Sequence, residues 1–384
     1  MMRQSEKFQL AALIAWKMQL AHRGKMLASG IGVAAGFLLS MAQIGLMMGW
    51  IDTCTLMIQR AEVDLWVIGV KSPAFDYGSP IPRQRLYQAR SVEGVSEAHA
   101  LFMSWTIWNR DDGRKVNVEL VGLDKELVGG PVQMLEGSLS SVLDDRKVVV
   151  DSKYLELLGV TGLGQRFEML GRRAEVTGIC EGVRTFTASP FIFTSIDDAI
   201  QYDKRYRHDE ITYVLVKCDE GIAINEVAQR LRENLPSVEV LTSSEFQWRT
   251  GQYWMIGTGI GFTVVMTAVL GLIIGALVIS QTLFSLLQDH RPHYATMLAL
   301  GFEVKLLGKI VFCQAFFLWL IGVVLGGVAF MAISYVAEFS PVPLRMPPTI
   351  LLLLLCSQIA SALFAGWWVL RKLRNIDPVT VFST

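Results

Sequence analysis

Two histidines near residue 290 have the spacing that best suits a metal ion. His290 and His293 are three residues apart, which places both side chains on one face of a helix, and Asp289 is adjacent. No cysteine or further histidine lies close to them in the sequence. We therefore expect these two histidines to be solvated or to face a partner protein rather than to bind a metal ion.

Catalytic motifs of the common enzyme classes are absent from the sequence. There is no GxxxxGK[ST] phosphate loop, and no HExxH, GxSxG or CxxC motif. The run GVTGLGQRF (159–167) lacks the Lys-Ser/Thr of a phosphate loop, so we interpret it as a turn. The acid pairs Asp111-Asp112 and Asp197-Asp198 are most simply turn and helix-cap residues. We predict a non-catalytic subunit with no directly bound cofactor, while a membrane enzyme using such carboxylates stays an alternative.

Four stretches without a formal charge are each long enough to cross a bilayer, which takes about 20 apolar residues. A charge at mid-bilayer costs roughly 2.5–3.5 kcal/mol on insertion scales, so such gaps in a chain with 18% charged residues indicate membrane spans. The four stretches are Ala28–Ile51, Thr250–Gln288, Ile310–Ala337 and Met346–Leu370. The second is longer than a bilayer needs, which predicts that part of it protrudes as a stalk, and the first could continue likewise through residues 52–60.

The lysines and arginines near the spans predict the orientation. They cluster before the first span, between the second and third, and after the fourth, whereas Glu338–Arg345 holds a single arginine. Both termini and the 289–309 connection are therefore expected in the cytoplasm. Lys+Arg equals Asp+Glu at 35 each, which gives no indication of a nucleic-acid partner.

The segment between the first two spans is expected outside, as a mixed α and β domain that could form two lobes. Strands are predicted at 62–70, 98–109, 115–123, 146–151, 173–180, 189–195, 210–218 and 238–242, and helices at 82–95, 152–159, 195–207 and 221–235. Trp105, Trp108 and Phe191 are interpreted as core residues. Cys180 and Cys218 could pair in an oxidising compartment, although their spacing does not require it.

The predicted fold is thus an α-helical membrane protein with four transmembrane helices and an extracytoplasmic α+β domain between helices 1 and 2. The expected division is 1–25, a cytoplasmic amphipathic helix; 26–60, the first span and stalk; 61–245, the periplasmic domain; 246–288, the second stalk and span; 289–304, a cytoplasmic coupling helix; 305–338 and 346–370, the third and fourth spans; and 371–384, a cytoplasmic tail.

The stretch DHRPHYATMLALGF (289–302) predicts a short cytoplasmic helix. Asp289 can cap it, Pro292 suits its first turn, and Gly301 ends it. Two helical turns are marginal alone, so the membrane or another protein must hold them. We expect a partner to dock on an apolar face of Tyr294, Met297 and Leu298. The candidate coupling residues are Asp289, Arg291, His293, Tyr294, Ala295, Met297, Leu298, Ala299 and Gly301.

The same stretch resembles the coupling segment of MacB/FtsX-type (type VII) ABC transporter permeases, roughly R-E-[IYF]-[AG]-x-[LM]-x-A-x-G. Tyr294, Ala295, Ala299 and Gly301 match, whereas Pro292-His293 stands where the family has Arg-Glu. The end of the chain, RKLRNIDPVTVF (371–382), is similar to the family's terminal motif, as is the order of one span, an outer domain and three spans. DLWVIG…RQRLYQARSVEGV (64–95) looks most like the DevC-type branch.

The resemblance implies a permease that works as a homodimer with two copies of a cytoplasmic ABC ATPase, which would bind ATP and Mg²⁺. It also implies a location in the bacterial inner membrane and mechanical export of a lipid-like or hydrophobic substrate with a periplasmic adaptor and an outer-membrane channel. An FtsX-like signalling subunit that controls a cell-wall hydrolase is the alternative. The sequence does not identify the substrate.

Overall fold

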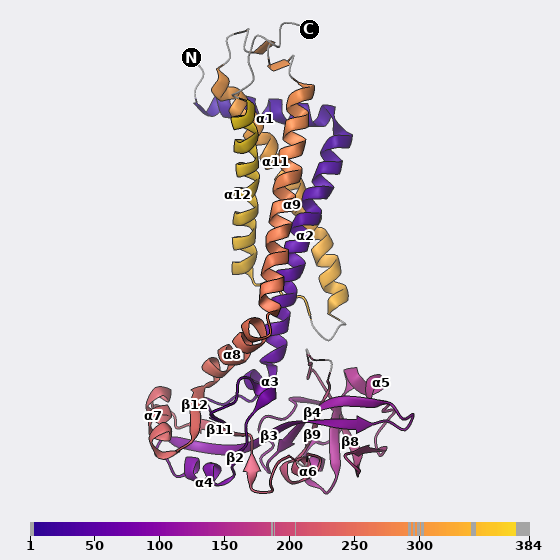
Figure 1. The fold of residues 1–384 in the computed structure, drawn as a ribbon, viewed down its shortest axis with the longest axis vertical. Helices are drawn as coiled ribbons and strands as arrows, with labels where there is room; N and C mark the ends of the chain where they lie inside the picture. Colours follow the sequence, from indigo (N-terminus) through magenta and orange to yellow (C-terminus); the bar gives the residue numbers. More distant parts are fainter. Residues whose placement is uncertain are drawn as a thin grey trace. The chain divides into compact units, whose positions relative to one another are not determined.

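The structure, a computed structural model shown in Figure 1, describes residues 4–185, 187, 189–203, 205–290, 293–294, 296–297, 300, 303–338 and 343–373. The chain divides into two compact units. We call Met1–Gly49 with Phe262–Thr384 the helical unit, and Trp50–Gly261 the inserted domain. The sequence prediction of an α+β domain placed between the first and second spans is confirmed.

Four long apolar helices form the body of the helical unit, and a fifth helix lies across one end of them (Figure 1). The long helices are α2 (Arg23–Cys54), α9 (Ile260–Asp289), α11 (Val304–Ala337) and α12 (Pro348–Leu373). Each contains a segment long and apolar enough to span a membrane. The fifth helix, α1 (Gln4–Ala21), ends one residue before α2 begins.

Glycines let α2 approach its neighbours closely. A Cβ atom at Gly36 would lie 2.6 Å from the carbonyl oxygen of Gly271 on α9. One at Gly326 on α11 would lie 2.9 Å from the carbonyl oxygen of Ala34. The hydroxyl of Ser40 donates a hydrogen bond of 2.9 Å to the carbonyl oxygen of Ala268. Small residues of this kind bring membrane helices into backbone contact where no hydrophobic effect drives them together.

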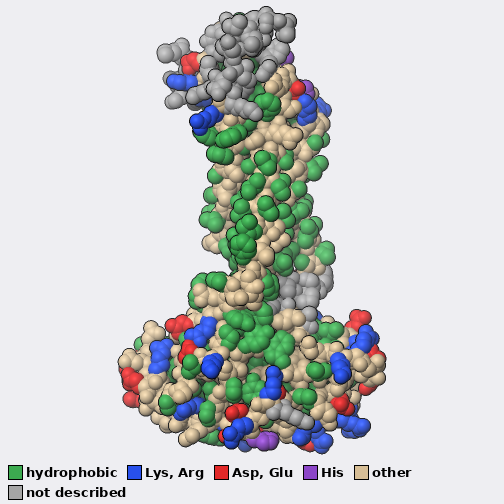
Figure 2. Space-filling view, in the orientation of Figure 1, with side chains coloured by type: hydrophobic (Ala, Val, Ile, Leu, Met, Phe, Trp, Pro, Cys, Tyr) green, Lys and Arg blue, Asp and Glu red, His purple; other side chains and the backbone are tan. Residues whose placement is uncertain are grey.

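The outer surface of the long helices is apolar. Figure 2 shows hydrophobic side chains along these helices on the face in view, whereas charged side chains gather on the inserted domain. Leu277, Val328 and Leu353 are more than half exposed. Near the end of α12, Arg371 lies 5.5 Å from the ring centre of Trp367. An indole beside a cationic side chain is typical of the membrane–water interface.

The inserted domain is built on a ten-stranded mixed sheet with the order β12-β1-β11-β3-β4-β9-β6-β8-β5, and β7 pairs with β3 and β8. Its strands are β1 (Leu65–Gly69), β3 (Val95–Asn109), β4 (Lys115–Leu123), β5 (Gln133–Gly137), β6 (Lys147–Asp151), β7 (Arg166–Met169), β8 (Arg172–Glu181), β9 (Phe191–Ser195), β11 (Tyr213–Cys218) and β12 (Val238–Thr242). A separate two-stranded sheet pairs β2 (Ile81–Pro82) with β10 (Glu210–Ile211).

Short helices and turns complete this domain. They are α3 (Leu56–Arg60), η1 (Phe75–Tyr77), α4 (Gln84–Arg90), η2 (Leu139–Leu143), η3 (Ser152–Tyr154), α5 (Leu155–Leu158), α6 (Ile196–Gln201), α7 (Ile224–Asn234), α8 (Ser243–Gln252) and the π-helical turn η4 (Tyr253–Gly257). Two hydrophobic clusters form the core, one containing Trp108 and the other Trp66 and Phe191. The prediction of core residues is confirmed for Trp108 and Phe191, whereas Trp105 is half-buried.

Several local predictions differ from the structure. Strands β2, β5 and β7 were not predicted, because β5 is largely exposed and the other two are very short. The helix expected over 195–207 is only the six residues of α6. The helix expected over 152–159 begins as the turn η3, which is capped by Asp151, whose carboxylate accepts the Lys153 amide at 2.9 Å. Cys180 and Cys218 are free thiols in this structure.

The helix expected over Thr250–Gln288 and the continuation expected through residues 52–60 are not continuous in the structure. The second stretch is interrupted by η4 and by Gly259, whose φ of +77° is a left-handed conformation that favours glycine. The first stretch, Ala28–Ile51, lies wholly within α2, and the break at Thr55, between α2 and α3, falls in its continuation through residues 52–60. Both breaks lie close to the boundaries between the helical unit and the inserted domain, which fall after Gly49 and after Gly261.

Candidate functional site

The candidate coupling segment follows directly from the end of α9. Asp289 is the last residue of that helix rather than the cap of a following one. A carboxylate at a helix C-terminus is unfavourable next to the helix dipole. Lys25, on α2, offsets this, because its Nζ lies 2.5 Å from Asp289 Oδ2 and 3.2 Å from the Ser285 hydroxyl. The ion pair therefore joins the ends of α2 and α9.

The environment of His290 contradicts the expectation of solvated or partner-facing histidines. The residue is 6% exposed, and its ring Nδ1 lies 2.9 Å from the carbonyl oxygen of Leu286. Its ring meets the ring of His22 edge-on at 5.0 Å and lies 5.6 Å from the ring of His293. The helical spacing brings these rings together for packing. Among the described residues, neither His290 nor His293 belongs to a cluster of three metal-ligand side chains.

Tyr294 is buried within the chain, although the sequence placed it on a docking face. Its side chain is 8% exposed and belongs to a hydrophobic cluster with Ala11 and Ala15 of α1 and Ile310 of α11. Its hydroxyl donates to the sulfur of Met18 at 3.8 Å. Burial raises the pKa of Tyr294 to about 12, so the phenol is neutral. The ring therefore anchors the segment to α1 and α11.

Met297 is half-buried against the same cluster, whereas His293 and Leu300 are exposed, Leu300 by 73%. A partner on this segment would therefore meet His293 and Leu300 rather than Tyr294. Five candidate residues, Arg291, Ala295, Leu298, Ala299 and Gly301, lie outside the described residues, as does most of the terminal motif at 371–382.

Two fully buried glutamines fasten α1 to α11. Gln19 Nε2 donates a hydrogen bond of 2.9 Å to the carbonyl oxygen of Gln314. The sequence predicts an amphipathic helix over 1–25, in which a glutamine would be expected on the polar face, but Ala11 and Ala15 are small and allow α11 to cover Gln19. The exposed side of α1 instead carries Phe8, Leu13 and Trp16 (40–58% exposed). That composition suits a helix at a membrane surface.

A second polar arrangement, which the sequence analysis missed, lies inside the inserted domain. Asp76, in η1, accepts a hydrogen bond of 2.9 Å from the indole of Trp254, in η4. Glu119, on β4, accepts from Thr187 at 2.6 Å and from Thr185 at 3.3 Å. Burial raises the pKa of Asp76 to about 6 and that of Glu119 well above its usual value, and each carboxyl further affects the other. The pair therefore holds a proton more tightly than free carboxyls do.

The acid pairs that an enzyme hypothesis would use have structural roles. Asp112 Oδ1 accepts the Arg114 amide at 3.0 Å in the turn between β3 and β4. Asp198, at the start of α6, accepts the Arg146 amide at 2.7 Å. Asp197 forms an ion pair of 3.2 Å with Arg83. These contacts account for the carboxylates as turn and helix-start residues.

Comparison with known proteins gives two family matches. The FtsX-like permease C-terminal model matches residues 265–378, and the MacB-like periplasmic core domain model matches residues 27–234, more than half of the chain. No curated protein matches the chain.

Solved structures also match over part of the chain. The periplasmic region of MacB from Actinobacillus actinomycetemcomitans is 10% identical with a TM-score of 0.38, covering 49% of this chain and 92% of that structure. The extracellular domain of the noncanonic ABC-type transporter YknZ from Gram-positive bacteria is 12% identical with a TM-score of 0.35, covering 47% of this chain and 98% of that structure.

The two family matches follow the order of the elements described above. The MacB-like match begins in α2 and ends with the last residue of α7, and the FtsX-like match begins in α9 and extends beyond α12. A multi-pass membrane protein with this arrangement has a permease-type role. The chain therefore belongs to the MacB/FtsX-type family of permeases.

Proposed function

We propose that this permease is the membrane subunit of an ABC exporter and that a separate ATPase drives it through the segment around residues 289–300. The observation that carries the proposal is the anchoring of Tyr294 to α1 and α11, together with the Lys25–Asp289 ion pair. A partner that moves this segment would displace α1, α2, α9 and α11 together, because a buried ring and a short ion pair resist separation. Two ATPase copies would bind the ATP and Mg²⁺, and two permeases would form a homodimer.

The export step would be mechanical. The four charge-free stretches offer no Asp, Glu, Lys or Arg to relay protons or ions, so the energy would come from the ATPase. The movement would reach the inserted domain through the two covalent connections at its boundary. In this proposal the domain lies in the periplasm and the termini lie in the cytoplasm, as the lysine and arginine distribution predicts.

The proposed cargo is lipid-like or hydrophobic, delivered with a periplasmic adaptor protein to an outer-membrane channel. The resemblance of residues 64–95 to the DevC-type branch supports the adaptor and the channel. The structures of MacB and YknZ regions lend no support to any particular cargo.

The test is co-purification with a candidate ABC ATPase, followed by measurement of ATP hydrolysis in nanodiscs. Leu300→Asp places a charge on the exposed end of the segment and should abolish ATPase association while the permease still inserts. The matched control is Leu163→Asp, an exposed leucine of the inserted domain. Equal ATPase recovery with both variants would contradict docking at this segment.

A second experiment separates export from signalling. Pull-down from cells with the full-length permease should recover a periplasmic adaptor. Recovery of a cell-wall hydrolase in its place would contradict export and favour the FtsX-like signalling alternative.

A further inference from the structure

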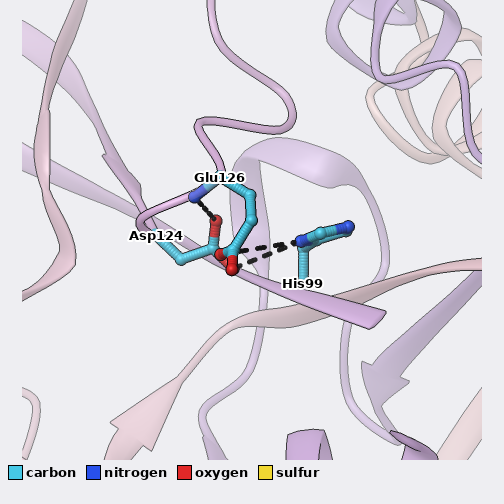
Figure 3. Close-up of side chains that lie close together, drawn as sticks. All are labelled: His99, Asp124 and Glu126. Atoms are coloured by element: carbon cyan, nitrogen blue, oxygen red, sulfur yellow. Dashed lines mark hydrogen bonds and ion pairs between the residues drawn. The ribbon is translucent and has the colours of Figure 1, made fainter. Parts of the chain in front are cut away.

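Three side chains of the inserted domain converge on one point, which Figure 3 shows. His99 Nδ1 lies 3.7 Å from Asp124 Oδ2 and 3.8 Å from Glu126 Oε2. One ligand atom from each residue lies within 4.8 Å of the other two. His99 is 6% exposed, and its buried Nδ1 makes no hydrogen bond in the structure.

The β3–β4 hairpin brings these residues together, although 24 positions separate His99 and Asp124 in the sequence. Leu101 of β3 pairs with Leu123 of β4 at the open end of the hairpin, so His99 and Asp124 lie just beyond the last pair. The backbone holds the Asp124 carboxylate in place. Its Oδ2 accepts the Ala100 amide at 3.0 Å, and its Oδ1 accepts the Glu126 amide at 3.2 Å.

A third carboxylate, that of Glu97, determines which nitrogen of His99 faces the cluster with a lone pair. Glu97 Oε2 lies 3.1 Å from Nε2, on the far side of the ring. A carboxylate accepts and does not donate, so Nε2 carries the proton. Nδ1 of the neutral ring then presents its lone pair to two carboxylate oxygens. Three electron-rich atoms with nothing between them repel one another, and a cation at their centre would relieve this repulsion. Carboxylate–histidine–metal arrangements fix the ring in the same way.

The two distances from His99 Nδ1 are longer than hydrogen bonds from a protonated Nδ1, which would be about 2.7–3.2 Å. Tetrahedral Zn²⁺ with bonds of about 2.0–2.1 Å places its ligand atoms roughly 3.3 Å apart, so each of these two distances would shorten by a few tenths of an ångström. The Glu126 side chain is 52% exposed and can supply this shift. Asp124 and its neighbours raise the pKa of His99, so a proton is the competing occupant.

We propose that His99, Asp124 and Glu126 form a binding site for a divalent transition-metal ion of the Zn²⁺ class, with Glu97 orienting the histidine. One nitrogen and two carboxylate oxygens are ligands that Zn²⁺ accepts, and the exposed side of Glu126 leaves a fourth position for water. The ion would fasten the connection from β4 to β5 onto β3. Leu127 and Val128 of that connection pack against the second hydrophobic cluster, so the ion would stabilise a contact already present. The site is independent of the proposed transport role.

The experiment uses the full-length chain, purified without a polyhistidine tag, stripped with a chelator and returned to metal-free buffer. Titration with Zn²⁺ in competition with a chromogenic chelator should show one saturable site per chain. Glu126→Gln should weaken binding by about 100-fold or more, because a ligand is lost. Glu97→Gln should weaken it by about 10–100-fold, because only the orientation of His99 is lost.

The matched control is Asp111→Asn, an exposed carboxylate at the opposite end of the same hairpin, which should bind like the unmodified chain. Titration with Co²⁺ should give the intense visible absorption of a tetrahedral site, and Glu126→Gln should lose it. Since Glu126 is exposed, this variant folds whether or not the site binds metal. The proposal would be overturned if no stoichiometric site were found, or if the unmodified chain and Glu126→Gln bound Zn²⁺ with equal affinity. The cluster would then be a protonated histidine among carboxylates.

Discussion

The indole Nε1 of Trp254 donates a hydrogen bond of 2.9 Å to Oδ2 of the buried residue Asp76. Trp254 belongs to the π-helical turn that precedes α9, and Asp76 belongs to the η1 turn of the inserted domain. Trp105 Nε1 donates to the backbone carbonyl of Asp76 at 2.8 Å. Two indoles therefore hold one residue, and through it the inserted domain is fastened to the segment that leads into the second span.

Trp254→Phe should destabilise the inserted domain by about 1–3 kcal/mol, because a buried carboxyl loses a donor when the indole is replaced by a smaller aromatic ring. Hydrogen exchange measured by mass spectrometry on the full-length chain should show faster exchange around residues 72–80 and 250–258. Trp248→Phe, at a tryptophan of α8 that is 69% exposed, is the control and should leave both segments unchanged. Equal protection in the two variants would contradict a role for the indole hydrogen bond.

The stability of the inserted domain should decrease as pH rises through the range in which Asp76 and Glu119 ionise. The pKa of Asp76 is about 6 in the folded chain against an ordinary value of 3.8, and Glu119 is raised in the same direction. The folded state thus binds more protons than the unfolded state, so this contribution is present below about pH 4 and is lost as pH rises through about 6 and beyond.

Glu119→Gln keeps the size and shape of the side chain and removes its ionisable carboxyl group. Its melting temperature should match that of the unmodified chain near pH 4.5 and exceed it near pH 8. Parallel melting curves for the two proteins across this range would show that Glu119 does not titrate as its burial implies.

Gly36→Ala should destabilise the helical unit by about 1–3 kcal/mol, because the added Cβ would lie 2.6 Å from a backbone oxygen of Gly271. The control is Gly327→Ala on α11, where a Cβ would have nothing within 4 Å. Alanine is the better helix former, so Gly327→Ala should be neutral or slightly stabilising. Thermal unfolding in detergent measures both variants, and equal shifts would argue against close packing of α2 and α9.

Replacement of Tyr294 separates packing from hydrogen bonding in the candidate coupling segment. Tyr294→Phe should cost less than about 1 kcal/mol, because a hydroxyl–thioether contact is weak. Tyr294→Ala should cost about 3–5 kcal/mol through the cavity it leaves against α1 and α11. In the proposed complex, Tyr294→Ala should also uncouple ATP hydrolysis from the permease while Tyr294→Phe remains coupled. Identical ATPase activities for the two variants would contradict anchoring by the ring.

Much of the architecture could be predicted from the sequence because its signals are local. A span is visible as a long gap between charges, and the β3–β4 hairpin is visible as two alternating runs around Asp111-Asp112-Gly113. The break at Gly259 was not predicted, because an apolar composition is the same whether the helix continues or stops. Only the left-handed φ of that glycine identifies the interruption.

The sites were harder to predict because their partners are distant in the sequence. From the sequence, Tyr294 is predicted to be an exposed residue of a short helix, because the sequence does not show that α1 covers it. His99 and Asp124 meet only because the hairpin register brings them together. The glycine contacts of α2 could have been predicted from the sequence. Gly32 and Gly36 are four residues apart, as are Gly271 and Gly275, and this spacing is typical of closely packed membrane helices.

The breaks at Thr55 and Gly259 determine what kind of load the two chain crossings can carry. A continuous helix is stiff, so it transmits bending as well as compression along its axis. A crossing that is interrupted by a turn bends more easily, because a change in a few backbone dihedral angles costs little free energy. Two interrupted crossings would therefore transmit compression and tension along the chain but little bending torque.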